Sequence, residues 1–113
     1  MIRVYVFKDG QKQISRLIIA GHSGYAQRGQ DIVCAAVSGA AGVLISGFDK
    51  DPYLKGCYKV RQAGTYMCFT MPRLAGDASQ IRAHALLDSF YRFIKGLQRQ
   101  YNNYITVLER EVR

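Results

Sequence analysis

Hydrophobic and polar residues alternate along the first part of the chain, and this alternation predicts two strands, over residues 2–7 and 14–20. The Asp9-Gly10 pair between them is typical of a β-hairpin turn. We therefore expect the fold to begin with an antiparallel pair of strands.

The pattern then changes to a stretch without charged residues, from residue 32 to 48, in which many residues are small. It predicts a helix that is apolar on all sides, and Asp31 stands where a helix N-cap is expected. Such a helix is either buried or spans a membrane. This one is shorter than the roughly 20 residues that a bilayer requires. We therefore expect no membrane span, and a helix that packs against the sheet or against a second subunit.

Alternation returns after residue 56 and predicts strands over residues 57–62 and 65–71, with a turn at Ala63-Gly64. Cys57 and Cys68 then fall on one face of this hairpin without lying opposite each other. The other face is the predicted core side, and it carries Tyr58, Val60, Met67 and Phe69.

A second helix is predicted over residues 78–101, opened by a capping box from Asp77 to Gln80 and followed by a last strand over residues 104–108. Its apolar face is predicted to carry Leu86, Leu87, Phe90, Phe93, Ile94, Leu97 and Tyr101. Its solvent face is predicted to carry His84, Asp88, Arg92, Lys95 and Arg99. We accordingly expect His84 to be a surface residue without a catalytic role.

The resulting order ββαββαβ predicts an α+β fold with two helices and a mostly antiparallel sheet. The length of 113 residues is that of a single domain, residues 1–113, with one core. Three cysteines without CxxC spacing argue against a disulfide framework and against a zinc site, so we expect neither a metal nor a cofactor. Together with the lack of a signal-peptide pattern, they favour the cytoplasm as the compartment.

The formal net charge of +8 allows two interpretations. The lysines and arginines are scattered along the chain, which is typical of a solvated surface. The second interpretation is a weak affinity for ribosomal RNA, because basic surfaces attract phosphates even without a recognition motif.

Two candidate catalytic residues lie between Gly21 and Ser38. His22 follows the end of a strand, and Cys34 is the third residue of a helix if Asp31 is its N-cap. Unpaired amides at a helix N-terminus favour a thiolate, which can attack a carbonyl while the histidine protonates the departing amine. The free amides of the same turn are candidates for stabilising the oxyanion. The simpler alternative is that Cys34 only fills the core, as free cysteines commonly do.

This segment resembles the ribosomal-processing cysteine proteases of the Prp family, through Gly21-His22, Gly24-Tyr25-Ala26, Gly29 and the run from Asp31 to Ser38. The resemblance implies a cytoplasmic enzyme, with a His22–Cys34 dyad, that removes an N-terminal extension from bacterial large-subunit ribosomal protein twenty-seven. It also implies paired phenylalanines before the cleaved bond. We expect Asp31 to act as cap and orienter, Gly24, Tyr25, Gly29 and Ser38 to form the substrate-binding region, and the protein to be a homodimer.

Three functional classes are therefore open. The first is a Cys-His endopeptidase, and the second is a basic, non-catalytic module that binds the ribosome or RNA. The third is a thiol redox sensor, for which neither Cys57 nor Cys68 is an obvious resolving thiol. Blocking Cys34 distinguishes the first class from the second.

Overall fold

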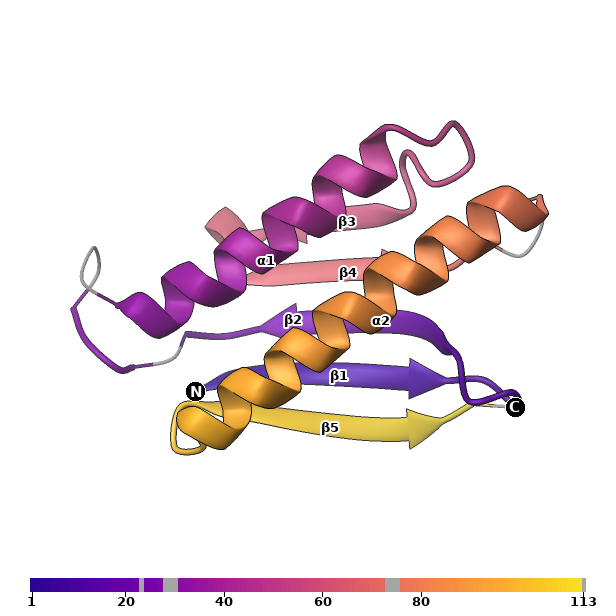
Figure 1. The fold of residues 1–113 in the computed structure, drawn as a ribbon. Helices are drawn as coiled ribbons and strands as arrows, with labels where there is room; N and C mark the ends of the chain where they lie inside the picture. The colour runs from indigo at the N-terminus through magenta and orange to yellow at the C-terminus, as the bar shows by residue number, and fades with distance from the viewer. Residues whose placement is uncertain (23, 28–30, 73–75, 113) are drawn as a thin grey trace.

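The computed structural model describes residues 1–22, 24–27, 31–72 and 76–112. Both helices lie on the same side of one five-stranded sheet, which gives the molecule two layers (Figure 1). The elements are β1 (Ile2–Lys8), β2 (Ile14–Ala20), α1 (Ile32–Asp49), β3 (Tyr58–Arg61), the short 3-10 helix η1 (Gln62–Gly64), β4 (Tyr66–Thr70), α2 (Asp77–Gln100) and β5 (Ile105–Glu111). The predicted ββαββαβ order and the α+β class are confirmed.

The sheet has the strand order β3-β4-β2-β1-β5, so the two strands of the first hairpin lie at its centre. Three of its neighbouring pairs are antiparallel, and only β1 and β5 run parallel. The first hairpin forms as predicted, but its loop is longer than a two-residue turn. The Asp9 carboxylate accepts hydrogen bonds from the Gln11 and Gln13 amides, and Lys12, not Gly10, has a positive φ of 62°.

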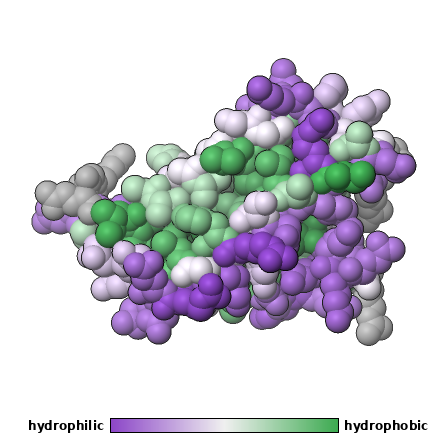
Figure 2. All heavy atoms as spheres, in the orientation of Figure 1, coloured by the Kyte–Doolittle hydropathy of each residue, from purple (hydrophilic) through white to green (hydrophobic). Residues whose placement is uncertain are grey.

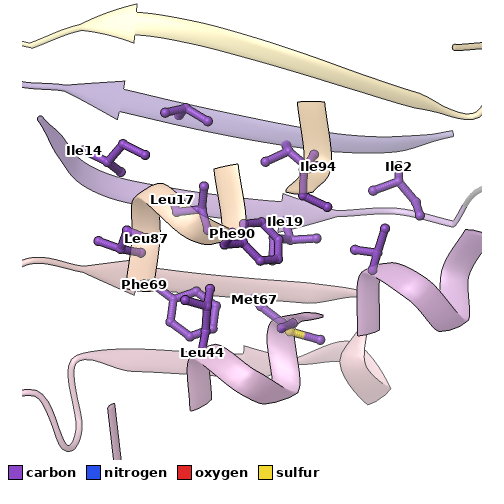
Figure 3. Close-up of a cluster of buried hydrophobic side chains, with 14 of the residues drawn as sticks. Ile2, Ile14, Leu17, Ile19, Leu44, Met67, Phe69, Leu87, Phe90 and Ile94 are labelled. Carbon is purple, nitrogen blue, oxygen red and sulfur yellow. The ribbon is translucent and has the colours of Figure 1, made fainter. Parts of the chain in front are cut away.

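The hydrophobic core lies between the sheet and the two helices (Figure 3). The central strands supply alternate residues to it, because successive side chains of a strand point to opposite faces. Val4 and Leu17 are fully buried in this way, and Leu44 of α1 and Leu87 of α2 belong to the same core cluster from the helix layer. The core therefore depends on residues from nearly every element.

Helix α1 packs against the sheet, which is one of the two predicted arrangements, but it is not buried on all sides. One stripe enters the core, made of Val33, Val37, Ala41, Leu44 and Phe48, whereas Val43 on another face is 65% exposed. Within the described residues, α1 is the one helix whose length and hydropathy would also suit a membrane span. Its buried stripe accounts for part of this hydropathy, but the apolar outer stripe, which includes Val43, stays exposed in the described part of the chain.

The second hairpin has the predicted register, with Tyr58 opposite Phe69 and Val60 opposite Met67. The predicted two-residue turn is instead the η1 turn, in which Ala63 has a left-handed φ of 54°. The predicted core side holds for Met67 and Phe69, but Val60 is 45% exposed because β3 lies at the sheet edge. Cys68 is buried on the face without helices, while Cys57 precedes β3 and packs against the core.

The predicted capping box of α2 does not form. Gly76 is the N-cap, no side chain caps this end, and Asp77 is the first helical residue. The apolar face is mostly as predicted, except that Phe93 is 47% exposed. On the predicted solvent face His84 and Lys95 are half-buried. The last strand is longer than predicted, because its parallel pairing with β1 continues to Glu111.

A buried carboxylate joins the end of α1 to the start of α2. Asp51 is 1% exposed and accepts hydrogen bonds from the Ser79 hydroxyl, from the Tyr53 and Leu54 amides and from the Arg82 guanidinium. Burial alone would raise the pKa of Asp51, but these hydrogen bonds outweigh it and hold the pKa below its ordinary value. This network connects the two helices at the end of the molecule remote from Cys34.

Candidate active site

His22 is positioned by the backbone at the end of β2. The preceding Gly21 has a φ of +94°, and a Cβ built on it would lie 2.5 Å from the Met1 carbonyl oxygen. The Gly21 amide donates a 2.9 Å hydrogen bond to the carbonyl of Thr65. Only glycine accommodates both the left-handed conformation and the close approach of Met1, so the turn that places His22 requires this residue.

Cys34 is half-buried in the first turn of α1. The N-cap Asp31 has extended backbone angles, and its Oδ1 accepts a 2.9 Å hydrogen bond from the Cys34 amide. The predicted capping role of Asp31 is thus confirmed. The cap defines the start of the helix and so fixes Cys34 at the third helical position, where the helix dipole favours negative charge.

His22 and Cys34 line the same cavity, which has a volume of about 120 Å³. Gly21 and Ser38 also line it, and its apolar wall is formed by Ile2, Ile19, Val37 and Met67. The histidine comes from the end of β2 and the cysteine from the start of α1, so the tertiary fold brings together two residues separated by a loop. Ser38 lies one helical turn beyond Cys34. Of the four residues predicted to bind the substrate, it is the one that lines this cavity among those the structure describes.

The β3–β4 turn forms another wall of the cavity, with Ala63, Gly64 and Thr65. The sequence pattern predicts these residues only as a turn and gives them no role at the site. Their only local signal is the Ala-Gly pair itself, because their closeness to His22 arises from the pairing of β4 with β2. Two successive non-glycine residues there, Gln62 and Ala63, have positive φ, a conformation that often marks functional turns.

The amides of the first turn of α1 differ in their availability to an oxyanion. The Cys34 amide donates to the Asp31 side chain, and the Ala35 amide donates to the Asp31 carbonyl at 3.0 Å. The earlier amides, those of Ile32 and Val33, are therefore the better candidates for donors to a developing oxyanion. The predicted oxyanion donors, which were all the amides of this turn, are thereby reduced to these two.

Tyr25, in the described part of the loop between His22 and Asp31, belongs to an aromatic cluster. Tyr25 packs edge-on against Tyr101 and Tyr104, with ring centroids 5.7 and 5.1 Å apart. Tyr25 and Gly24 are not among the residues that line the cavity of Cys34, and Gly29 lies outside the described residues. Tyr25 thus joins the loop to the connection between α2 and β5.

The remaining cysteines and the second histidine lie elsewhere. His84 lines a hollow beside Ile14, at the opposite end of β2 from His22. Cys57 and Cys68 do not line the cavity of Cys34. Among the described residues, no group of three or more His, Cys, Asp or Glu side chains could hold a metal ion. Among the described residues that line this cavity, Cys34 supplies a thiol, His22 an imidazole, and Ser38 and Thr65 a hydroxyl each.

Comparison with known proteins agrees with this chemistry. The model of the family "Cysteine protease Prp" matches residues 1–106. The ribosomal processing cysteine protease Prp of Bacillus subtilis strain 168 is 25% identical over 113 residues, covering 95% of this chain and 96% of the relative. The crystal structure of the ribosomal processing protease Prp of S. aureus with a covalently linked product peptide has a TM-score of 0.81 at 18% identity, covering 97% of this chain and all of that one.

A crystal structure from Streptococcus mutans shares the fold at a TM-score of 0.76 and 22% identity, covering 99% of this chain and 96% of that one. The match to the family model spans the strand, loop and helix that carry His22 and Cys34, together with both hairpins and α2. The chain belongs to the cysteine protease Prp family.

Proposed function

We propose that this cysteine protease uses Cys34 as its nucleophile and His22 as its general base and acid. The observation that carries the proposal is that these two side chains, from different elements, line one cavity. Ser38 lines the same cavity and is available to contact the substrate beside the nucleophile. Asp31 acts as a positioning residue because it caps the helix that holds Cys34.

The proposed reaction has two steps. The Cys34 thiolate attacks the scissile carbonyl carbon and forms a tetrahedral oxyanion, which amides at the start of α1 stabilise. Its collapse breaks the C–N bond, and the imidazolium of His22 gives its proton to the departing amine. Water, deprotonated by His22, then hydrolyses the thioester, releases the acid and restores the thiol.

We propose as substrate the flexible N-terminal extension of bacterial large-subunit ribosomal protein twenty-seven. The support is the ribosomal-processing activity named for the relative from Bacillus subtilis, together with the shape of the cavity. Its apolar wall, formed by Ile2, Ile19, Val37 and Met67, suits an apolar side chain of the substrate. We accordingly propose the cytoplasm as the compartment, because a ribosomal protein is made there.

A cleavage assay tests the proposal. The purified protein is incubated with a synthetic peptide that spans the extension and its cleavage site, and products are identified by mass spectrometry. Cys34→Ala and His22→Ala should each lower kcat/KM by at least about 1,000-fold, as the loss of a nucleophile or its base does. Cys57→Ala and His84→Ala are the matched controls and should cleave normally. Full activity of Cys34→Ala would refute the assignment.

Alanine in place of the aromatic residues of the peptide tests the specificity separately. Burial of one large apolar side chain contributes roughly 1.5–3 kcal/mol, so kcat/KM should fall about 10- to 100-fold. An unchanged kcat/KM, with Cys34→Ala still inactive, would leave the enzyme assignment intact and contradict the proposed role of the apolar wall.

We also propose a homodimer that forms through the apolar groove between α1 and α2. The groove has a volume of about 400 Å³ and is lined by residues that include Gly39, Val43 and Phe93. Figure 2 shows hydrophobic side chains gathered on this face of the molecule. Because α1 carries no charge from residue 32 to 48, two copies of this basic protein can meet there without charge repulsion.

Sedimentation velocity tests the dimer. Val43→Glu should convert a dimer to a monomer, whereas Ile81→Glu, which changes an equally exposed residue that does not line the groove, should leave it unchanged. A monomeric parent protein would refute this proposal without bearing on the peptidase.

A further inference from the structure

The face of the sheet opposite the helices is a second surface of defined chemistry. Both helices cover one face (Figure 1), and the alternation of each strand turns its other residues to the open face. The strand registers place these residues in rows across the sheet. One row contains Thr70, Arg16, Phe7 and Arg110, and another contains Arg61, Tyr66, Ala20, Arg3 and Thr106.

The strand residues of this open face include cationic side chains and no acidic ones. The cationic side chains are Arg3, Arg16, Lys59, Arg61 and Arg110, and all are exposed. The strand positions on this face include none of the eight acidic residues of the chain. Glu109, the acid of β5 nearest to them, lies on the helix side, where it contacts Tyr91 of α2 and Lys8.

Aromatic rings alternate with these cations. Arg110 lies opposite Phe7, Arg61 lies opposite Tyr66, and the guanidinium carbon of Arg16 lies 6.0 Å from the centroid of the Phe7 ring. All three rings of the face, those of Tyr5, Phe7 and Tyr66, are half-buried, so each keeps part of its surface open to a ligand. Single-stranded nucleic acids bind to such surfaces, because their bases stack on aromatic rings and their phosphates contact neighbouring cations.

The face is also hollowed. A groove of about 550 Å³ runs beside β3 and β4, and Arg16, Lys59, Arg61 and Tyr66 line it. It does not include His22 or Cys34, which belong to the smaller cavity. Because Cys34 lies on α1, on the other side of the sheet, a ligand in this groove leaves the Cys34 thiol accessible.

We propose that the open face of the sheet binds single-stranded RNA. In this complex the bases stack on the rings of Tyr5, Phe7 and Tyr66, and the cationic side chains of the same face contact the phosphates. A second copy of the chain is disfavoured here, because two faces of the same positive charge repel each other. A duplex is disfavoured because its bases are stacked on each other and cannot stack on side chains. The choice of RNA over DNA rests on the proposed substrate, a ribosomal protein, so RNA bound here would keep the peptidase near that substrate.

Fluorescence anisotropy with a labelled 12-nucleotide oligouridylate tests this proposal. The triple variant Arg16→Gln, Lys59→Gln, Arg110→Gln should weaken binding at least tenfold. It should also reduce the slope of log K against log salt by about 2, since each phosphate contact on a single strand contributes roughly 0.7. The matched control Arg92→Gln, Lys50→Gln, Arg99→Gln removes the same charge elsewhere and should bind within about twofold of the parent protein.

Two further variants test stacking. Phe7→Leu and Tyr66→Leu keep the charge and much of the apolar contact, and each should weaken binding roughly five- to a hundredfold, the range of one base–aromatic stack. Thermal unfolding of every variant, and its cleavage of the free peptide, should match the parent protein. Loss of RNA binding with retained peptidase activity therefore separates this proposal from the proposed function.

Several outcomes would overturn the proposal. The first is an equal loss of affinity in both triple variants, which would mean nonspecific attraction. The second is binding of a duplex, or of the corresponding DNA oligomer, as tight as that of the oligouridylate. A parent protein that binds no oligouridylate would also overturn it. So would a change of oligomeric state in the open-face triple variant during sedimentation, because the face would then be covered by a second copy.

Discussion

The carboxylate of Asp31 accepts a hydrogen bond from the backbone amide of Cys34, with 2.9 Å between Oδ1 and the nitrogen. This contact fixes where α1 begins and, with it, the orientation of the cysteine toward the cavity of His22. It needs a side-chain oxygen and does not need a negative charge. Stability and catalysis can therefore be separated by substitution at this position.

Asp31→Asn should retain most of the stability, because asparagine can make the same capping bond. Asp31→Ala should lose about 1 kcal/mol of the free energy of unfolding, the usual contribution of an N-cap. Urea denaturation of both variants is the measurement. Equal destabilisation by the two substitutions would contradict the capping role, and a loss of kcat in Asp31→Asn with stability retained would show that the charge acts on catalysis.

Cys34 should react with iodoacetamide at pH 7 faster than the other two cysteines, because of the three it is the one that lines the cavity of His22, in the N-terminal turn of α1. The expected ratio of rates is at least about tenfold, as for other activated cysteines. Peptide mapping by mass spectrometry after timed alkylation measures the three rates together. The less exposed Cys68 and the half-buried Cys57 are internal controls. A Cys34 no faster than Cys57 would argue against activation.

Gly21→Ala should impair both folding and cleavage. Alanine at a φ of +94° is strained by roughly 1–3 kcal/mol, and its Cβ would meet the backbone oxygen of Met1, which cannot rotate away. The neighbouring His22 should shift, so kcat/KM should fall further than stability alone explains. The control is Gly10→Ala, where a Cβ meets nothing within 4 Å. Calorimetry and the peptide assay test this prediction, which fails if the two alanine variants behave alike.

The Asp51 network should make stability depend on pH in the acid range. Hydrogen bonds from Ser79 and its other partners outweigh burial and lower the pKa of Asp51, so the unfolded chain binds its proton more readily than the folded one. The stabilisation is complete above the ordinary aspartate pKa, about 3.9, and is lost as the pH falls through the lower folded value. Thermal unfolding from pH 7 to pH 2 measures this loss.

Asp51→Asn is the variant for that experiment. Its melting temperature at pH 7 should be lower by about 4–8 °C or more, because a buried hydrogen-bond network is disrupted. Its dependence on pH below 4 should be weaker than that of the parent protein. Asp88→Asn, which removes an exposed carboxylate paired with Arg92 on the helix surface, is the control. Parallel pH profiles for the Asp51→Asn variant and the parent protein would refute the role of Asp51.

The local elements of the fold could be predicted because their signals are local. Alternation of period two marks β1, β2 and β4, and the change to an uncharged run after Asp31 marks the start of α1 to the residue. The cap of α1 was predictable from one side chain, but that of α2 was not. There Gly76 takes the cap position through its backbone alone and leaves Asp77 inside the helix.

Of the candidate site, the sequence by itself determined its two chemical groups and the cap, since His22, Asp31 and Cys34 stand at the ends of predictable elements. Only the tertiary structure decided what surrounds them. The pairing of β4 with β2 brings the turn at Ala63 to Thr65 into the wall of the cavity, through contacts between residues distant along the chain. Packing of both helices on one face likewise decides that α1 keeps an exposed apolar stripe. The same packing leaves the other face of the sheet open, and arginines that lie far apart in the sequence come together there. This happens because the strand registers, and not closeness in the sequence, set which side chains share a face.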